Sequence, residues 1–190
     1  WRKFVELVGM ATGWGIDQNV KEAYRFLVQH YDKGRGGEDR DRIFIFGYSR
    51  GAYTARVLAG FLNCLGLIGK DQLNLLDYAF RAYKAVNEKG EEAADWDELN
   101  LYERMLQPDH PPIRCLGLFD TVASVMEWGR HGPRLRLDAA TSVNPSVEAV
   151  RHAVAVDERR SMFQPVLWPS GQDYYGNRFK RAKAREQDAR

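Results

Sequence analysis

The sequence predicts one α/β domain in which a mostly parallel sheet is flanked by helices. Helical and strand-like segments alternate along the chain, which is typical of this fold class. Residues 43–46 are apolar at every position, as expected of a central parallel strand that helices cover on both faces. The chain has 190 residues, 44% of them hydrophobic and 28% charged, which suits one buried core and is too short for two domains.

The first half of the chain predicts a helix, a strand, a helix and then a helical pair. Apolar residues at helical spacing predict a helix over 16–31, and the strand at 43–46 follows a glycine-rich charged loop. A second helix is predicted over 52–65, with a glycine as its stop. Residues 71–107 predict two more helices with a break near Gly90.

The second half predicts a strand over 113–119 and a loop over 127–143. A helix is predicted over 144–156, because its Asn-Pro start combines a good N-cap with a good first-turn residue. Residues 166–168 predict a short final strand.

Composition argues against several kinds of ligand. The net charge is +2, so no nucleic-acid partner is expected. Cys64 and Cys115 lie far apart in apolar runs and predict buried free thiols, with a single disulfide as the alternative. No metal-binding Cys or His spacing occurs, and we expect neither a metal nor an organic cofactor. The glycines of 13–18 resemble a dinucleotide fingerprint that lacks its last glycine, so we interpret them as a structural turn.

Residues 47–51 read Gly-Tyr-Ser-Arg-Gly and fit the G-x-S-x-G pattern of a nucleophile elbow. The pattern lies between an apolar strand and a long helix, which is the context it requires. We predict a strained backbone at Ser49, with Gly47 and Gly51 lacking side chains so that the turn can close. Ser49 is then the nucleophile at a helix N-terminus, and the backbone N–H of Arg50 is the oxyanion-hole donor. The alternative is a tight turn in which the serine is only a small residue.

A serine nucleophile needs a general base, normally a histidine that a carboxylate orients. Asp120 follows Ser49 in the order serine, acid, histidine that belongs to this motif. It also ends a buried strand, and the active sites of open α/β sheets lie at such ends. We therefore predict Asp120 as the triad acid, with a turn-forming aspartate as the alternative.

None of the four histidines fits the base well. His30 precedes the serine, and His110 lies before the acid's strand, at the opposite edge of the sheet. His131, in a loop after Asp120, stays open. His152 is predicted in mid-helix, pointing away from the apolar stripe and paired with the glutamate four residues before it. We expect the base to lie outside this chain.

Three segments together resemble one known family. They are 46–56 (FGYSRGAYTAR), 116–122 (LGLFDTV) and 151–159 (RHAVAVDER). In this order they resemble the α/β-hydrolase family that includes type VI secretion phospholipase effectors and many relatives of unknown function. The likeness covers nearly the whole chain, and it makes residues 1–190 look like a single, partial α/β-hydrolase catalytic domain.

The resemblance implies Ser49 as nucleophile, Asp120 as acid and a structural role for His152. It also implies a catalytic histidine shortly after Arg190, followed by an aspartate and a glycine run, and an Asp-Gly-rich opening strand before Trp1. We therefore interpret the chain as a fragment that is incomplete at both ends and is nearly inactive alone.

The predicted function is that of a serine hydrolase that cleaves carboxyl esters through an acyl-enzyme on Ser49. The resemblance implies lipid or phospholipid esters at a membrane surface as substrate, and secretion-machinery or immunity proteins as partners. An inactive hydrolase-like binding domain, a thioesterase and a peptidase are the alternatives. No signal peptide opens the chain and no apolar stretch could span a bilayer, which fits cytoplasmic synthesis, although a contractile injection machine needs no such signal. The compartment stays open.

Two further segments have two interpretations each. The large apolar residues of 71–107 fall between the nucleophile helix and the acid strand, where either a lid over an acyl-binding cleft or extra core would sit. The basic run 178–185 is either a contact for anionic lipid head groups or a solvated surface segment.

Overall fold

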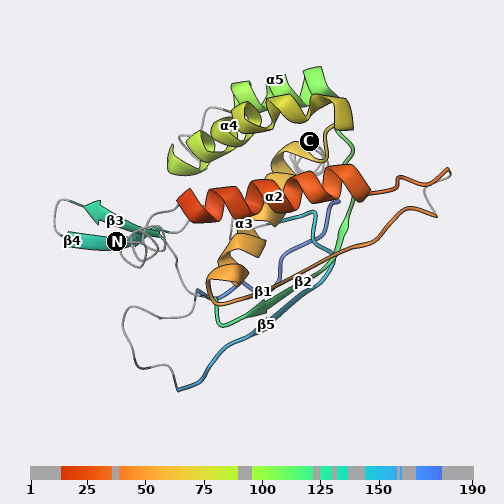
Figure 1. The fold of residues 1–190 in the computed structure, drawn as a ribbon. Coiled ribbons are helices and arrows are strands. Elements are labelled where there is room, and N and C mark those ends of the chain that lie inside the picture. Colours follow the sequence, from red (N-terminus) through yellow and green to blue (C-terminus); the bar gives the residue numbers. More distant parts are fainter. Residues whose placement is uncertain are drawn as a thin grey trace, which may run out of the picture.

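The computed structural model contains a small parallel sheet. It describes residues 14–35, 39–89, 96–121, 125–129, 132–136, 144–157, 159 and 166–176. The sheet has the strand order β1-β2-β5, formed by Ile43–Tyr48, Ile113–Phe119 and Val150–Ala153. All neighbouring strands in it run parallel. Parallel strands with flanking helices are compatible with the predicted α/β class (Figure 1).

The helices lie together on one side of this sheet (Figure 1). They are α2 (Trp14–His30), α3 (Arg50–Leu65), the 3-10 turn η1 (Lys70–Leu75), α4 (Leu76–Lys89) and α5 (Asp97–Leu106). Helix α3 contacts β1 and β2 directly, and α2, α4 and α5 pack against α3. The predicted first helix, second helix and helical pair are confirmed to within a few residues. In the part of the chain that the structure describes, no helix is long and apolar enough to cross a membrane.

Helix α3 is buried along most of its length because other elements surround it. Its ring Phe61 is fully buried and lies against Tyr24 of α2 and against Phe80 and Tyr83 of α4, at centroid distances of 4.8, 5.2 and 5.2 Å. Aromatic pairs in this distance range add to the stabilisation that burial alone provides. The core therefore surrounds α3, between the sheet and the outer helices.

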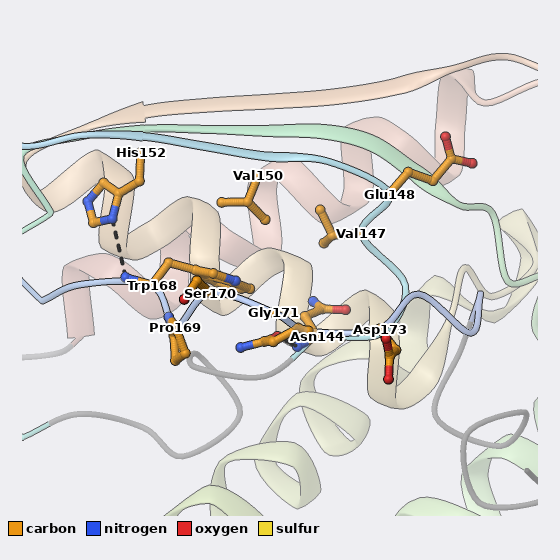
Figure 2. Close-up of a pocket in the computed structure, with 11 residues that line it drawn as sticks. Asn144, Val147, Glu148, Val150, His152, Trp168, Pro169, Ser170, Gly171 and Asp173 are labelled. Atoms are coloured by element: carbon orange, nitrogen blue, oxygen red, sulfur yellow. Dashed lines mark hydrogen bonds between the residues drawn. The ribbon is translucent and has the colours of Figure 1, made fainter.

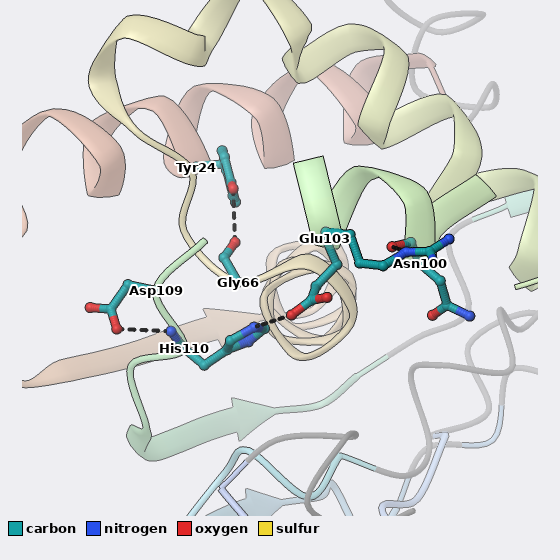
Figure 3. A network of polar contacts seen from close by, with 7 residues as sticks. Tyr24, Gly66, Asn100, Glu103, Asp109 and His110 are labelled. Carbon is teal, nitrogen blue, oxygen red and sulfur yellow. Dashed lines mark hydrogen bonds and ion pairs between the residues drawn. The ribbon is translucent and has the colours of Figure 1, made fainter. Parts of the chain in front are cut away.

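The hydroxyl of Tyr24 fixes the end of α3. It donates a hydrogen bond to the carbonyl of Gly66 at 2.8 Å and accepts one from the N–H of Ile68 at 3.1 Å (Figure 3). Gly66 ends α3 with φ +80°, and an added Cβ would lie 2.4 Å from a backbone oxygen, so glycine is needed there. Burial raises the pKa of Tyr24 well above its ordinary value, so the hydroxyl stays protonated.

One face of β1 is exposed, contrary to the expectation that helices cover both faces. Ile43 and Ile45 are buried, whereas Phe44, Phe46 and Tyr48 are 55%, 65% and 69% exposed. Alternate residues of a strand point to opposite faces, and the described helices cover only one of them. β1 also forms an edge of the described sheet rather than its centre.

The prediction of a helix over 144–156 is wrong. The side chain of Asn144 accepts hydrogen bonds from the N–H and the hydroxyl of Ser146, at 3.0 and 2.5 Å, and so forms a tight turn instead of a helix cap. The N–H of Glu148 then bonds to the carbonyl of Ile113, which carries the chain into β5 beside β2. Pairing with a distant strand therefore overrides the local helical pattern.

Two smaller expectations also differ from the structure. The loop predicted over 127–143 contains most of an antiparallel hairpin, β3 (Val125–Gly129) with β4 (Gly132–Arg136). Residues 166–168, predicted as a strand, join no sheet among the described residues. Neither cysteine is in a disulfide, as predicted, although Cys115 is only partly buried.

We predict that Tyr24→Phe lowers the free energy of unfolding by about 1–3 kcal/mol, because two buried backbone groups lose their partner. Tyr78→Phe is the matched control, since Tyr78 is 55% exposed. Urea denaturation compares the two variants, and equal stabilities would contradict the role assigned to the Tyr24 hydroxyl.

Candidate active site

Ser49 and Asp120 lie at neighbouring positions on one edge of the sheet. Ser49 directly follows β1, and Asp120 directly follows β2. The last residues of the two strands, Tyr48 and Phe119, are paired, and the N–H of Ser49 donates to the carbonyl of Phe119 at 2.8 Å. The structure thus brings together the two residues that the sequence nominated, at the carboxyl edge where ligands bind in open α/β sheets.

Both residues have a backbone conformation that side chains rarely adopt. Ser49 has φ 55° and ψ −120°, and Asp120 has φ 46°. In the described part of the chain, Gln107 at the end of α5 is the one other non-glycine residue with positive φ. Such conformations cost on the order of 1–3 kcal/mol each and cluster at functional sites. The strain predicted at Ser49 is present.

The turn at Ser49 needs glycine on one side only. A Cβ on Gly47 would lie 2.3 Å from the carbonyl oxygen of Gly51 and 2.6 Å from the backbone of Ala52, so no side chain fits. A Cβ on Gly51 would meet no atom within 4 Å. The expectation that Gly51 must lack a side chain is therefore wrong, because the first turn of α3 directs that position to solvent.

Helix α3 begins immediately after the serine. Its first residue is Arg50, and the carbonyl of Ser49 accepts the N–H groups of Ala52 and Tyr53 at 3.1 and 3.3 Å. The backbone N–H of Arg50 thus lies in the first turn, where the helix dipole favours negative charge. Ser49 itself is partly exposed.

The Asp120 carboxylate is anchored through one oxygen. Oδ1 accepts the N–H of Ala155 at 2.6 Å, and the N–H of Asp120 donates to the carbonyl of Ala153 at 2.9 Å. Its Oδ2 has no hydrogen bond to the described residues. The carboxylate therefore bonds across to the segment that follows β5, rather than to its own turn.

His152 lies on β5, so its predicted place in mid-helix is wrong. Its Nδ1 accepts the N–H of Trp168 at 3.3 Å, and its Nε2 lies 3.2 Å from the hydroxyl of Thr121 (Figure 2). Because a backbone N–H can only donate, Nδ1 carries no proton and Nε2–H donates to Thr121. Burial lowers the pKa of His152, Arg56 lowers it further, and Asp120 opposes them, so the ring is neutral at neutral pH.

These contacts argue against His152 as the general base, because both ring nitrogens already have hydrogen-bond partners. His30 is exposed near the end of α2 and donates to a carbonyl of its own helix. His110 lies at the amino end of β2, as predicted, 3.8 Å from Glu103 of α5 (Figure 3). His131 lies outside the described residues.

Arg56 is a site residue that the sequence reasoning missed. Its side chain is 1% exposed, and its guanidinium donates to the carbonyls of Val166 and Leu167 at 2.6 and 3.5 Å. The guanidinium also lies over the ring of Trp168, 5.0 Å from its centroid. Burial lowers the pKa of Arg56 to about 10, so it stays charged at neutral pH. The signal available in the sequence was an arginine within the otherwise apolar run 55–62.

A cavity of about 290 Å³ lies between β5 and the segment that carries Trp168 (Figure 2). His152 and Trp168 line one end, and Asn144 and Gln172 contribute polar groups. Within the described ranges, no group of His, Cys, Asp or Glu side chains could hold a metal ion.

Comparison with known proteins identifies the family of this chain. A family model described as the catalytic domain of the Tle1-like phospholipase effectors of type VI secretion matches residues 1–188. The chain belongs to this family. An uncharacterized protein of Saccharomyces cerevisiae, YEL023C, is 35% identical over 170 residues, covering 85% of this chain and 23% of that protein. The Tle1-like chain thus spans about a quarter of that relative's length. No solved structure matches this chain.

We predict that Gly47→Ala and Gly51→Ala in this Tle1-like domain have opposite effects. The Gly47 substitution forces strand and helix apart and destabilises the fold by about 1–3 kcal/mol or more. The Gly51 substitution fits open space in a helix, where alanine is favoured by roughly 1 kcal/mol. Melting temperatures of the two purified variants check this; a Gly51→Ala protein that is as unstable as Gly47→Ala would contradict the geometry.

Proposed function

We propose that this chain carries the catalytic serine of an α/β-hydrolase that cleaves the carboxyl esters of lipids. Phospholipids are the substrates that we propose first. The observation that carries the proposal is the pair of strained residues, Ser49 and Asp120, on one sheet edge at the start of α3. The family description, a phospholipase effector, supports lipid esters as the substrate class.

The proposed reaction has two steps. In the first, Ser49 Oγ forms a bond to the ester carbonyl carbon while a histidine takes the hydroxyl proton. The N–H of Arg50 holds the developing oxyanion, and collapse breaks the bond to the alcohol, which leaves with the proton from the histidine. In the second, water attacks the acyl-enzyme by the same route and releases the fatty acid. Asp120 orients the histidine and stabilises its positive charge.

The general base is proposed to be a histidine outside the described residues. The contacts of His152 argue against that residue as the base, and the family resemblance implies a histidine shortly after Arg190. Asp120 Oδ2, which has no hydrogen bond among the described residues, is the oxygen we assign to that histidine. The isolated 190 residues are then expected to hydrolyse esters poorly. If they hydrolyse esters well, His131 is the base to test.

Other hydrolase classes remain candidates for the experiment. A thioesterase or a peptidase would use the same serine and acid, and a hydrolase-like binding domain would keep the fold without turnover. Export by a type VI machine, and partners from that machine or from immunity proteins, follow from the family description alone. The lid role of 71–107 stays a prediction; its side chains Leu76, Phe80 and Leu99 are buried in the shared core and would have to leave it.

We predict that Ser49→Ala lowers kcat for phospholipid hydrolysis by at least about 10⁴-fold, because no oxygen is left to form the acyl-enzyme. The full-length protein is incubated with phosphatidylethanolamine and phosphatidylglycerol vesicles, and released fatty acid is measured by mass spectrometry. Ser170→Ala, at an exposed position of the 166–176 segment, is the matched control. Full activity in a correctly folded Ser49→Ala protein would refute the proposal.

We predict that Asp120→Asn lowers kcat by about 10⁴-fold with little change in folding. An asparagine oxygen still accepts the N–H of Ala155, so the substitution removes the charge and keeps the anchor. Asp157→Asn, in the exposed turn after β5, is the matched control. Steady-state kinetics on a soluble ester separates kcat from KM, and an unchanged kcat would remove Asp120 from the reaction.

A further inference from the structure

A chain of partly buried polar contacts connects the nucleophile helix to the acid. The guanidinium of Arg56, on α3, holds the carbonyls of 166 and 167. The N–H of Trp168 in that segment donates to His152, and His152 donates to the hydroxyl of Thr121. We call these four residues, Arg56, Trp168, His152 and Thr121, the brace.

The brace ends at the peptide that carries the acid. Thr121 is fully buried and directly follows Asp120. Its carbonyl accepts the N–H of Val166 at 2.9 Å, and its hydroxyl accepts Nε2–H of His152 at 3.2 Å. Asp120 itself is held from the other side by Ala153 and Ala155. Residues 120 and 121 are therefore fixed by β5 and by the 166–168 segment together.

We propose that His152 is a positioning residue of the hydrolase site, whose neutral ring holds Thr121 and thereby sets the direction of the Asp120 carboxylate. The inference rests on the proposed function, since it assigns a role within that reaction. Displacing a catalytic group by about 1 Å costs roughly 10²-fold in rate, so a small shift at Thr121 is sufficient to matter.

The brace requires the uncharged form of His152. A second proton would sit on Nδ1 and point at the N–H of Trp168, so that two donors would face each other. The ring faces the cation Arg56 from α3 and the carboxylate Asp120 from the end of β2, and its pKa lies below the ordinary value of 6.5. The unfolded chain therefore takes up the proton first, and the contribution of the brace, complete above about pH 6.5, is lost as the pH falls below it.

Two substitutions of His152 separate the two halves of the brace. In His152→Asn, the new amide oxygen lies near the position of Nδ1 and keeps the contact with Trp168, but the shorter side chain does not reach Thr121. In His152→Gln, the new amide N–H lies near the position of Nε2 and keeps the bond to Thr121. We expect His152→Asn to lower kcat of the full-length protein about 10- to 100-fold with KM unchanged. His152→Gln is expected to recover most of that loss.

One further variant, Thr121→Val, and one control at the exposed His30 complete the set of substitutions. Thr121→Val removes the acceptor with the same shape and is expected to match His152→Asn, and the double variant is expected to be no worse than either one. His30→Asn, on the outer surface of α2, is the control. Rates are expressed per active site titrated with an organophosphonate, so that unfolded protein does not count.

Two measurements do not depend on turnover. The ¹⁵N shifts of the His152 ring are expected to show the Nε2–H tautomer, with a pKa below 6.5, and Thr121→Val is expected to alter the Nε2 signal. The free energy of unfolding of the wild-type protein is expected to fall below about pH 6.5, and less so in His152→Gln, which has no titrating ring at this position.

The inference is overturned if His152→Asn keeps the wild-type kcat, if the losses at 121 and 152 add, or if the ring is protonated on Nδ1. If His152→Gln is as inactive as Ser49→Ala, His152 is the base and not a positioning residue. Failure of the proposed function is distinct, because it shows as a wild-type protein without activity or an active Ser49→Ala variant, and this inference then falls with it.

Discussion

The reversal of the chain between β1 and α3 is the constraint on which the rest of the structure depends. Strand and helix meet so closely that the carbonyl oxygen of Gly51 occupies the space of a side chain on Gly47. Only Ser49 lies between them, with φ 55°, and its N–H is held by the carbonyl of Phe119 on the neighbouring strand. This turn thus places Ser49 at the sheet edge and at the start of α3. It also joins Ser49 to β2, the strand that Asp120 follows.

Helix α3 carries the consequences of this turn into the core. Its apolar surface packs on the sheet and on three other helices, so most of its side chains are buried. Arg56 is buried there too, and its guanidinium is satisfied by backbone carbonyls and an aromatic face. A buried cation of this kind is costly unless it is well paired, which limits how the 166–168 segment can lie. The position of the 166–168 segment near Asp120 therefore depends on the position of α3, the helix that follows Ser49.

The sequence predicted the parts of the site that local chemistry determines. The Gly-Tyr-Ser-Arg-Gly pattern located the strained turn, and the apolar strand before Asp120 placed that residue on the same edge. What the sequence could not supply depends on distant partners. β5 forms because β2 pairs with it, whereas its own residues suggested a helix. The ring of His152 is engaged by Thr121 and Trp168, 31 and 16 residues away in the chain, and Arg56 binds a segment 110 residues later.

The bare face of β1 has a practical consequence. Phe44, Phe46 and Tyr48 stand in a row on a strand whose outer edge has no partner in the described sheet. Exposed aromatic rings on an edge strand favour strand pairing between two copies of a chain. Handling of the isolated 190 residues should therefore favour dilute solutions and mild detergent. Covering Phe44, Phe46 and Tyr48 with a fusion partner, or replacing them with polar residues, is the first step toward a sample that does not aggregate.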